Sequence, residues 1–85
     1  MSQRQSPPIK ARIIFDLGDE SKARALALSL QPDEKFKLEG LKIRTAQRGN
    51  SVVTYILCRR GARSMAETLD DLLRAVNLVL EVIEP

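Results

Sequence analysis

The repeat distance of the apolar residues changes along this 85-residue chain, and those changes restrict the fold more than any other feature. A repeat of two residues is typical of a strand with one buried face, and a repeat of three to four residues is typical of a helix. Along the chain, a repeat of two is followed by a repeat of three to four, a second repeat of two, a nearly continuous apolar run that is consistent with a buried strand, and again a repeat of three to four. This order predicts a single α+β domain over residues 9–85, with a three-stranded antiparallel sheet, two helices on one face of that sheet and the order β-α-β-β-α.

The first strand is predicted by alternation and the first helix by its two ends. Apolar and polar residues alternate over residues 9–16. The side chain of Asp19 can accept hydrogen bonds from the free amide groups at the start of a helix. Pro32 cannot continue a helix, because it lacks the amide hydrogen. A helix is therefore expected from about Asp19 or Glu20 to Gln31.

The middle of the chain reads as a hairpin. Residues 41–48 alternate, residues 51–59 are a nearly continuous apolar run, and Gly49-Asn50 between them is a turn signal for an antiparallel pair. One face of the sheet is expected to lie away from the helices, and dimerisation through the sheets would cover its apolar part. That part is predicted to consist of Ile14 with either Val53, Tyr55 and Leu57 or Val52, Ile56 and Cys58.

The last helix is predicted over about Ser64 to Glu84, where Ser64 and Glu67 have the spacing of a capping box. Its apolar residues fill a wider sector than one small sheet can cover. A second apolar strip therefore either contacts another chain or packs against the first helix of the same chain. The core-facing stripe is predicted to consist of Met65, Leu69, Leu72, Leu73, Val76, Val79, Leu80 and Ile83, and the second strip of Ala75, Leu78 and Val82.

The composition argues against most catalytic and metal sites. The chain has no His and one Cys, so neither a Ser-His-Asp or Cys-His catalytic group nor a zinc cage of cysteine and histidine can be assembled within it. Asp70 and Asp71 are neighbours, which points them about 100° apart on a helix and makes them a poor acid-base pair. We expect no enzymatic activity and no cofactor, and we expect Cys58 to be a buried structural thiol.

The remaining composition is ordinary for a folded domain. Apolar residues make up 44% of the chain and charged residues 29%, which is too apolar for a disordered chain. The apolar runs are far shorter than the ~20 residues that cross a bilayer, and no charged leader opens the chain. A cytoplasmic protein without membrane contact is therefore expected. Residues 1–8 are polar, end in two prolines and are expected to form a flexible tail.

The charge is unevenly distributed. Residues 1–63 contain 13 Lys and Arg against 6 Asp and Glu, or +7, whereas residues 64–85 contain one Arg against five Asp and Glu, or −4. The basic part is either a solvated surface or a surface for an anionic partner. A free-standing RNA-binding module is the alternative function, although Phe15, Phe36 and Tyr55 lie in no basic-aromatic motif. The cations that this alternative would use are Lys10, Arg12, Lys42, Arg44, Arg48, Arg59, Arg60 and Arg63.

Three segments in a fixed order give the chain a family resemblance. The string SLQPD at residues 29–33 closes the first helix, a basic hairpin follows it, and the last helix contains TLDDLLRAV at residues 68–76. In this order they resemble the small Pcc-type (CTAG/Pcc) subunit of the KEOPS/EKC complex, which installs threonylcarbamoyl on adenosine of tRNA. The resemblance covers about residues 9–84, and its most specific part is the Leu-x-Pro-Asp helix exit. It departs at Asp71, where family members often carry Asn.

The resemblance implies a non-catalytic scaffold subunit, an archaeal or eukaryotic host, and a homodimer that brings two threonylcarbamoyltransferase subunits together. In that family the helices contact an N-terminal helical hairpin of the transferase, and the small kinase subunit joins through the transferase. A weak auxiliary contact with tRNA is expected at Lys42, Arg44, Arg48, Arg59, Arg60 and Arg63. The residues expected in or just beneath the partner contact are Leu26, Leu30, Leu69, Leu72, Ala75, Val76, Leu78, Val79 and Val82.

Overall fold

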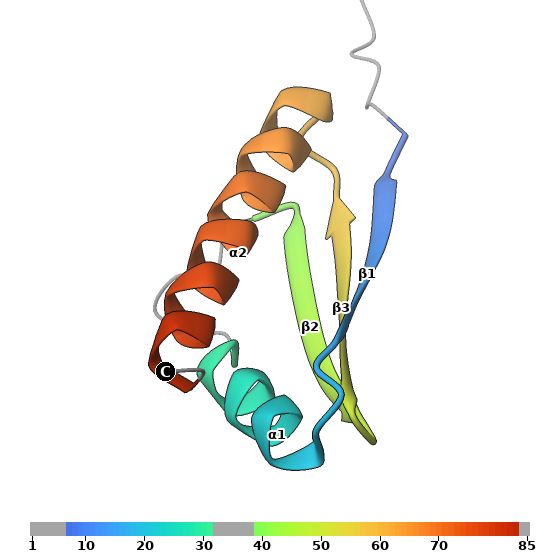
Figure 1. Ribbon diagram of the computed structural model, residues 1–85. Coiled ribbons are helices and arrows are strands. Elements are labelled where there is room, and N and C mark those ends of the chain that lie inside the picture. The colour runs from blue at the N-terminus through green and yellow to red at the C-terminus, as the bar shows by residue number, and fades with distance from the viewer. Residues whose placement is uncertain (1–6, 32–38, 84–85) are drawn as a thin grey trace, which may run out of the picture.

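Five elements of secondary structure follow one another in the predicted order. The computed structural model describes residues 7–31 and 39–83. Figure 1 shows both helices on the same face of a three-stranded sheet, which confirms the predicted α+β fold. The elements are β1 (Ile9–Asp16), α1 (Glu20–Ser29), β2 (Leu41–Arg48), β3 (Ser51–Cys58) and α2 (Ala62–Ile83).

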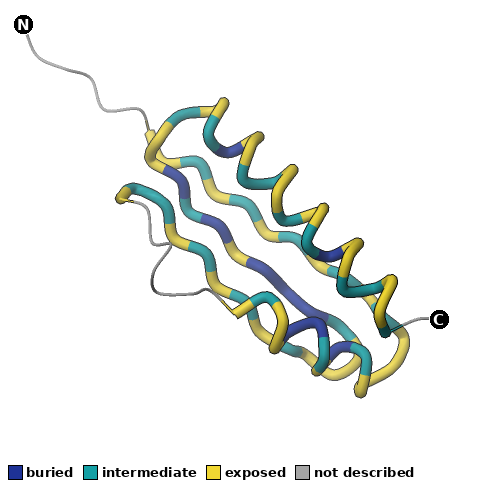
Figure 2. The backbone as a smooth tube through the Cα atoms, turned by 90° about the vertical axis from the view of Figure 1, so that its left-hand side faces the viewer, coloured by how far each residue is buried: buried dark blue, intermediate teal, exposed yellow. Residues whose placement is uncertain are grey.

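The strand β3 lies in the centre of the sheet, between β1 and β2, and both of its pairings are antiparallel. Its position agrees with its sequence, because a central strand is shielded by neighbours on both edges and β3 is nearly continuously apolar. Figure 2 shows the longest buried stretch of the sheet along this strand. The hairpin of β2 and β3 is confirmed, and β3 ends at Cys58, one residue before the predicted end.

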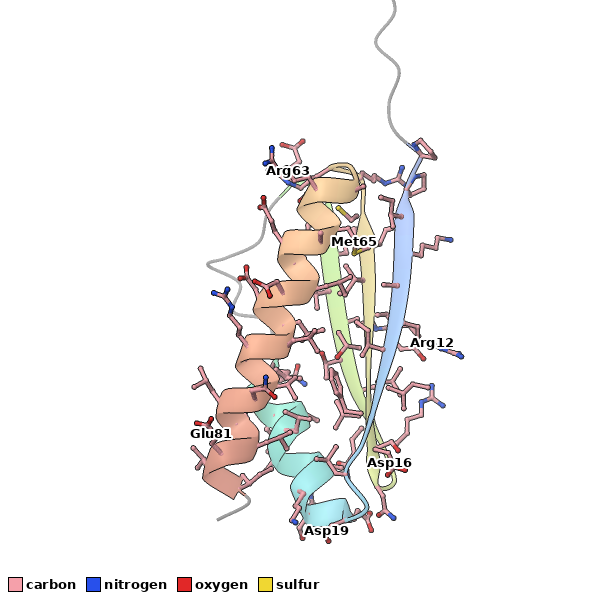
Figure 3. The ribbon with its side chains drawn as sticks, turned by 45° about the horizontal axis from the view of Figure 1, so that its top comes forward. Arg12, Asp16, Asp19, Arg63, Met65 and Glu81 are labelled. Carbon is pink, nitrogen blue, oxygen red and sulfur yellow. The ribbon has the colours of Figure 1, made fainter. Side chains whose placement is uncertain are left out.

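The core lies between the sheet and the two helices and has two parts. In the first, Leu26 of α1 packs with Val52 of β3 and Val76 of α2. In the second, Met65 of α2 packs with Cys58 of β3, and Figure 3 shows the Met65 side chain pointing toward the sheet. The thiol of Cys58 has no exposed surface, which confirms the predicted burial.

The start of α1 is the one predicted from its cap. Asp19 has an extended backbone, and its side chain accepts a hydrogen bond of 3.2 Å from the backbone amide of Lys22. The helix ends at Ser29, two residues before the predicted Gln31. Pro32, which the prediction used as the helix stop, lies outside the described residues.

The start of α2 differs from the prediction. The helix begins at Ala62, and Ser64 lies inside its first turn, so the predicted cap at Ser64 is wrong. The carbonyl of Gly61 instead accepts a hydrogen bond of 3.2 Å from the amide of Met65. Gly61 has a φ of +93°, a conformation that glycine adopts without steric cost. The sharp turn at this glycine brings the chain into the helix earlier than the capping-box spacing indicates.

One residue of the predicted core stripe lies outside the core. Leu73 of α2 is 48% exposed, so its placement in the core is wrong. It lies three residues from the buried Val76, which is about 60° around the helix, at the border of the covered sector.

Most of the predicted tail lies outside the described residues, and Pro7 and Pro8 are exposed and precede β1 without regular structure.

Candidate functional site

The sheet has a face that the helices do not cover, which we call the open face. Residues alternate between the two faces along β1 and β2, and the exposed ones lie on the open face. Figure 3 shows Arg12 pointing away from the helices on this side. The open face consists of Lys10, Arg12, Ile14 and Asp16 from β1, Ser51, Val53, Tyr55 and Leu57 from β3, and Lys42, Arg44, Ala46 and Arg48 from β2.

The pairing register arranges the open face in rows, each with one residue of β3 between two residues of the outer strands. Two neighbouring rows have a cation on each side of an uncharged centre. These rows are Arg12, Tyr55 and Arg44, and Lys10, Leu57 and Lys42. The two lines of cations are therefore separated by two strand spacings, which is about 9–10 Å at the backbone.

These two rows line a hollow of about 420 Å³ on the open face. Its floor is formed by Tyr55, which is 37% exposed, and by Leu57, and its rims are formed by the cations of β1 and β2. Among the residues that the structure describes, the four rim cations have no ion-pair partner. Asp16 is the one acid on the described open face, two rows away from Tyr55. The hollow is therefore a strongly positive site with an apolar, aromatic floor.

Three of the six cations expected to contact tRNA lie on the open face. Lys42 and Arg44 line the hollow, and the structure adds Lys10 and Arg12 to them from the other outer strand. Arg48 lies at the hairpin end of the sheet, in the same row as Asp16 and Ser51. The expected contact with tRNA stays a prediction.

The other three of those cations follow β3 and do not belong to the open face. Arg59 is exposed just beyond the end of β3. The guanidinium of Arg60 donates a hydrogen bond of 3.2 Å to the carbonyl of Glu39, which ties it to the turn before β2. Arg63 lies in the first turn of α2, 4.0 Å from the carboxylate of Glu67. The hollow and these three arginines are separate features.

Of the two alternatives for the part of β3 that faces away from the helices, the structure confirms Val53, Tyr55 and Leu57, but a role for Tyr55 in a site was not predicted. Tyr55 stands in an apolar run, where alternation alone does not decide which face a residue lies on. A signal was present in the hairpin, because a two-residue turn at Gly49-Asn50 pairs Arg48 with Ser51 and hence Arg44 with Tyr55. The pairing with Arg12 joins distant parts of the chain and has no such local signal.

A second surface lies on α2, at the apolar strip formed by Ala75, Leu78 and Val82. Leu78 is 65% exposed and Val82 is 81% exposed, and Ala75 is half-buried. The alternative in which this strip packs against the first helix of the same chain is therefore wrong. Arg74 and Glu81 are exposed beside the strip, and Figure 3 shows Glu81 pointing away from the sheet. The strip is an apolar surface with a polar rim.

The remaining residues of the expected partner contact are covered within the chain. Leu26 has no exposed surface and Val76 is 3% exposed, so neither side chain is accessible to a partner. The half-buried ones are Leu30, Leu69, Leu72 and Val79. The structure also exposes Leu28 of α1, at 67%, which the sequence analysis did not select.

The described residues contain neither a cluster of metal-binding side chains nor a membrane-spanning helix. In residues 7–31 and 39–83, no group of three or more His, Cys, Asp and Glu side chains is arranged to hold a metal ion. In the same residues, neither helix is long and apolar enough to span a membrane. No protein-family model and no curated protein matches the chain.

Proposed function

We propose that this chain is a non-catalytic scaffold subunit that forms a homodimer and binds threonylcarbamoyltransferase subunits, as its resemblance to Pcc-type subunits implies. The observation that carries the proposal is the exposure of Leu78 and Val82 on α2. Leu78 and Val82 lie in the last turns of α2, the longer of the two helices. This position fits a partner whose own helices pack beside α2. The order of elements and the length of the chain also support it.

The energetics favour a protein partner for the apolar strip. Leu78 and Val82 are four residues apart, so they lie one above the other on the same face of α2. Burying a Leu or Val side chain contributes about 1.5–3 kcal/mol relative to leaving it in water. The exposed Arg74 and Glu81 next to them supply the polar rim that surrounds the apolar centre of protein interfaces.

The size of the domain gives a second argument for assembly. A domain of this length buries only roughly 60% of the surface that its unfolded chain exposes, which leaves a small margin of stability. Burial of the strip against a partner adds apolar contact that the single chain lacks. A homodimer that carries two transferase subunits then follows from the resemblance.

The test is the mass of the purified protein in solution, measured by light scattering alone and with a threonylcarbamoyltransferase subunit. We expect a dimer that grows into an assembly of two chains and two transferases. Leu78→Asp and Val82→Asp should each weaken transferase binding by about tenfold or more, because each loses apolar burial and places a charge in the contact.

The matched control is Asn77→Asp, which adds the same charge one residue away, on the polar side of α2. It should bind the transferase like the unchanged chain. Circular dichroism and thermal unfolding establish that all three variants are folded. A folded Leu78→Asp variant that binds the transferase with unchanged affinity would contradict the proposal, as would a monomer that ignores the transferase.

A further inference from the structure

We infer that the open face of the sheet binds a short single-stranded segment of nucleic acid, with a base stacked on Tyr55 and phosphates held by Arg12 and Arg44. This inference does not rest on the proposed function, because α2, the helix that carries the apolar strip, lies on the other side of the sheet (Figure 1). It is carried by the register of the sheet, the exposure of Tyr55 and the charge of the hollow.

The positive charge of the open face favours an anionic ligand. Four cations surround the hollow, and none has an ion-pair partner among the described residues. Cations placed along a groove in this way bind phosphates and release the counterions that surround a nucleic acid. A second copy of this chain on the same face would set four cations against four, which opposes dimerisation through the open faces. The sheet dimer considered from the sequence is thus disfavoured by charge.

The aromatic floor of the hollow favours single-stranded nucleic acid over a duplex. Tyr55 lies in the middle of β3 and keeps 37% of its surface exposed, with a cation on each side in the same row. An aromatic ring in such a place stacks with a nucleobase, whatever the base, because every base has a π-face. In a duplex those faces are occupied by neighbouring bases, so the stacking partner is an unpaired base.

The neighbouring row extends the site along the strand. Leu57 continues the apolar floor next to Tyr55, and Lys10 and Lys42 repeat the pair of cations. Residues two apart on a strand are about 6.5–7 Å apart along it. A nucleic-acid strand that follows β3 therefore meets a cation on either side at each of two successive rows.

The chain supplies its own reporter for this test. Tyr55 is its one tyrosine, and the chain contains no tryptophan, so intrinsic tyrosine fluorescence reports on Tyr55 alone. The probe is a fluorescein-labelled oligouridylate of about ten nucleotides for anisotropy, and the unlabelled oligomer for tyrosine emission. We expect saturable binding that weakens steeply with salt and quenches the tyrosine emission.

Variants separate stacking from charge. Tyr55→Phe keeps the ring and should bind within about twofold of the unchanged chain, whereas Tyr55→Leu should lower the affinity about fivefold or more. The double variant Arg12→Gln/Arg44→Gln should weaken binding and reduce the slope of log affinity against log salt by about 1.4, or about 0.7 for each lost phosphate contact.

The matched control is the double variant Arg24→Gln/Arg74→Gln, which removes the same net charge from exposed sites on the helices. It should change the affinity by less than about twofold. Equal losses in the two double variants would overturn the inference, because binding would then depend on net charge alone. Unchanged binding by a folded Tyr55→Leu variant, absent quenching of tyrosine, or equal affinity for a duplex of the same length would overturn it as well.

Failure of this inference is distinguishable from failure of the proposed function. Leu78→Asp should leave binding of the oligomer unchanged, and Tyr55→Leu should leave transferase binding unchanged. A chain whose dimer dissociates in the Tyr55→Leu variant would show that a second copy occupies the open face, which contradicts the inference.

Discussion

Thr54 shares a hydrogen bond of 3.2 Å with Thr45 across β3 and β2, on the face of the sheet that the helices cover. Thr54 has no exposed surface, whereas Thr45 is half-buried. Because Thr54 is fully buried, its hydroxyl has no access to water and depends on the Thr45 hydroxyl for its hydrogen bond.

This dependence predicts which of two matched substitutions is more harmful. Thr45→Val leaves the Thr54 hydroxyl buried without its partner and should lower the free energy of unfolding by about 1–3 kcal/mol. Thr54→Val removes the buried hydroxyl itself and should cost less than about 1 kcal/mol. Urea denaturation of both variants measures the difference.

The double variant Thr45→Val/Thr54→Val completes the cycle. Because it removes both hydroxyl groups together, its free energy of unfolding should lie above that of Thr45→Val alone. Additive losses would show that the hydroxyl groups do not depend on each other.

Two leucines on α1 test the placement of that helix. Leu26 has no exposed surface and Leu28 is 67% exposed, although they are only two residues apart. Leu26→Ala should lower the free energy of unfolding by about 2–5 kcal/mol, because it leaves a cavity in the core. Leu28→Ala should change it by less than about 0.5 kcal/mol. Similar losses at both positions, measured by urea denaturation, would contradict this orientation of the helix.

The fold was predictable from the sequence because each element has its own local signal. Alternation marks β1 and β2, the turn at Gly49-Asn50 sets the hairpin, and Asp19 marks the start of α1. The start of α2 was not predictable in the same way. Ser64 and Glu67 have the spacing of a capping box, but they do not cap the helix. The helix begins earlier, at Ala62, directly after the positive-φ residue Gly61.

The candidate sites were predictable only in part, because they depend on contacts between distant parts of the chain. The wide apolar sector of α2 left two alternatives for Leu78 and Val82, packing against α1 or exposure to a partner, and the structure shows that both side chains are exposed. The hollow needs β1 and β2 on the two sides of β3. Nothing local in the sequence places Arg12 beside Tyr55, so the position of Tyr55 between two cations emerged only from the register of β1 and β3.

The cap of α1 gives a further prediction. Asp19 accepts a hydrogen bond from the amide of Lys22, and its negative charge lies at the positive end of the helix dipole. Asp19→Ala should lower the free energy of unfolding by about 1 kcal/mol. Asp19→Ser keeps an acceptor in place and should recover most of that loss. Equal stability of the two variants in thermal unfolding would exclude a capping role for this side chain.

The turn before β2 links Gly40 to Arg60, and this contact gives the last prediction. Gly40 has a φ of +81°, and a Cβ atom placed on it would lie 3.3 Å from the Cγ atom of Arg60. Gly18 has a similar φ of +69°, but nothing lies within 4 Å of a Cβ atom there. Gly18→Ala thus meets backbone strain alone, at a cost of about 1–2 kcal/mol, and Gly40→Ala meets the same strain together with crowding.

Gly40→Ala should therefore destabilise the protein more than Gly18→Ala does, and the excess should depend on Arg60. In the background of Arg60→Ala the crowding is removed, so the two glycine substitutions should then cost the same. Urea denaturation of the single and double variants measures the free energy of unfolding of each variant, and hence the cost of each substitution. An excess at Gly40 that persists without the Arg60 side chain would show that the crowding comes from elsewhere in the turn, and equal costs in the unchanged background would show that Arg60 moves aside freely.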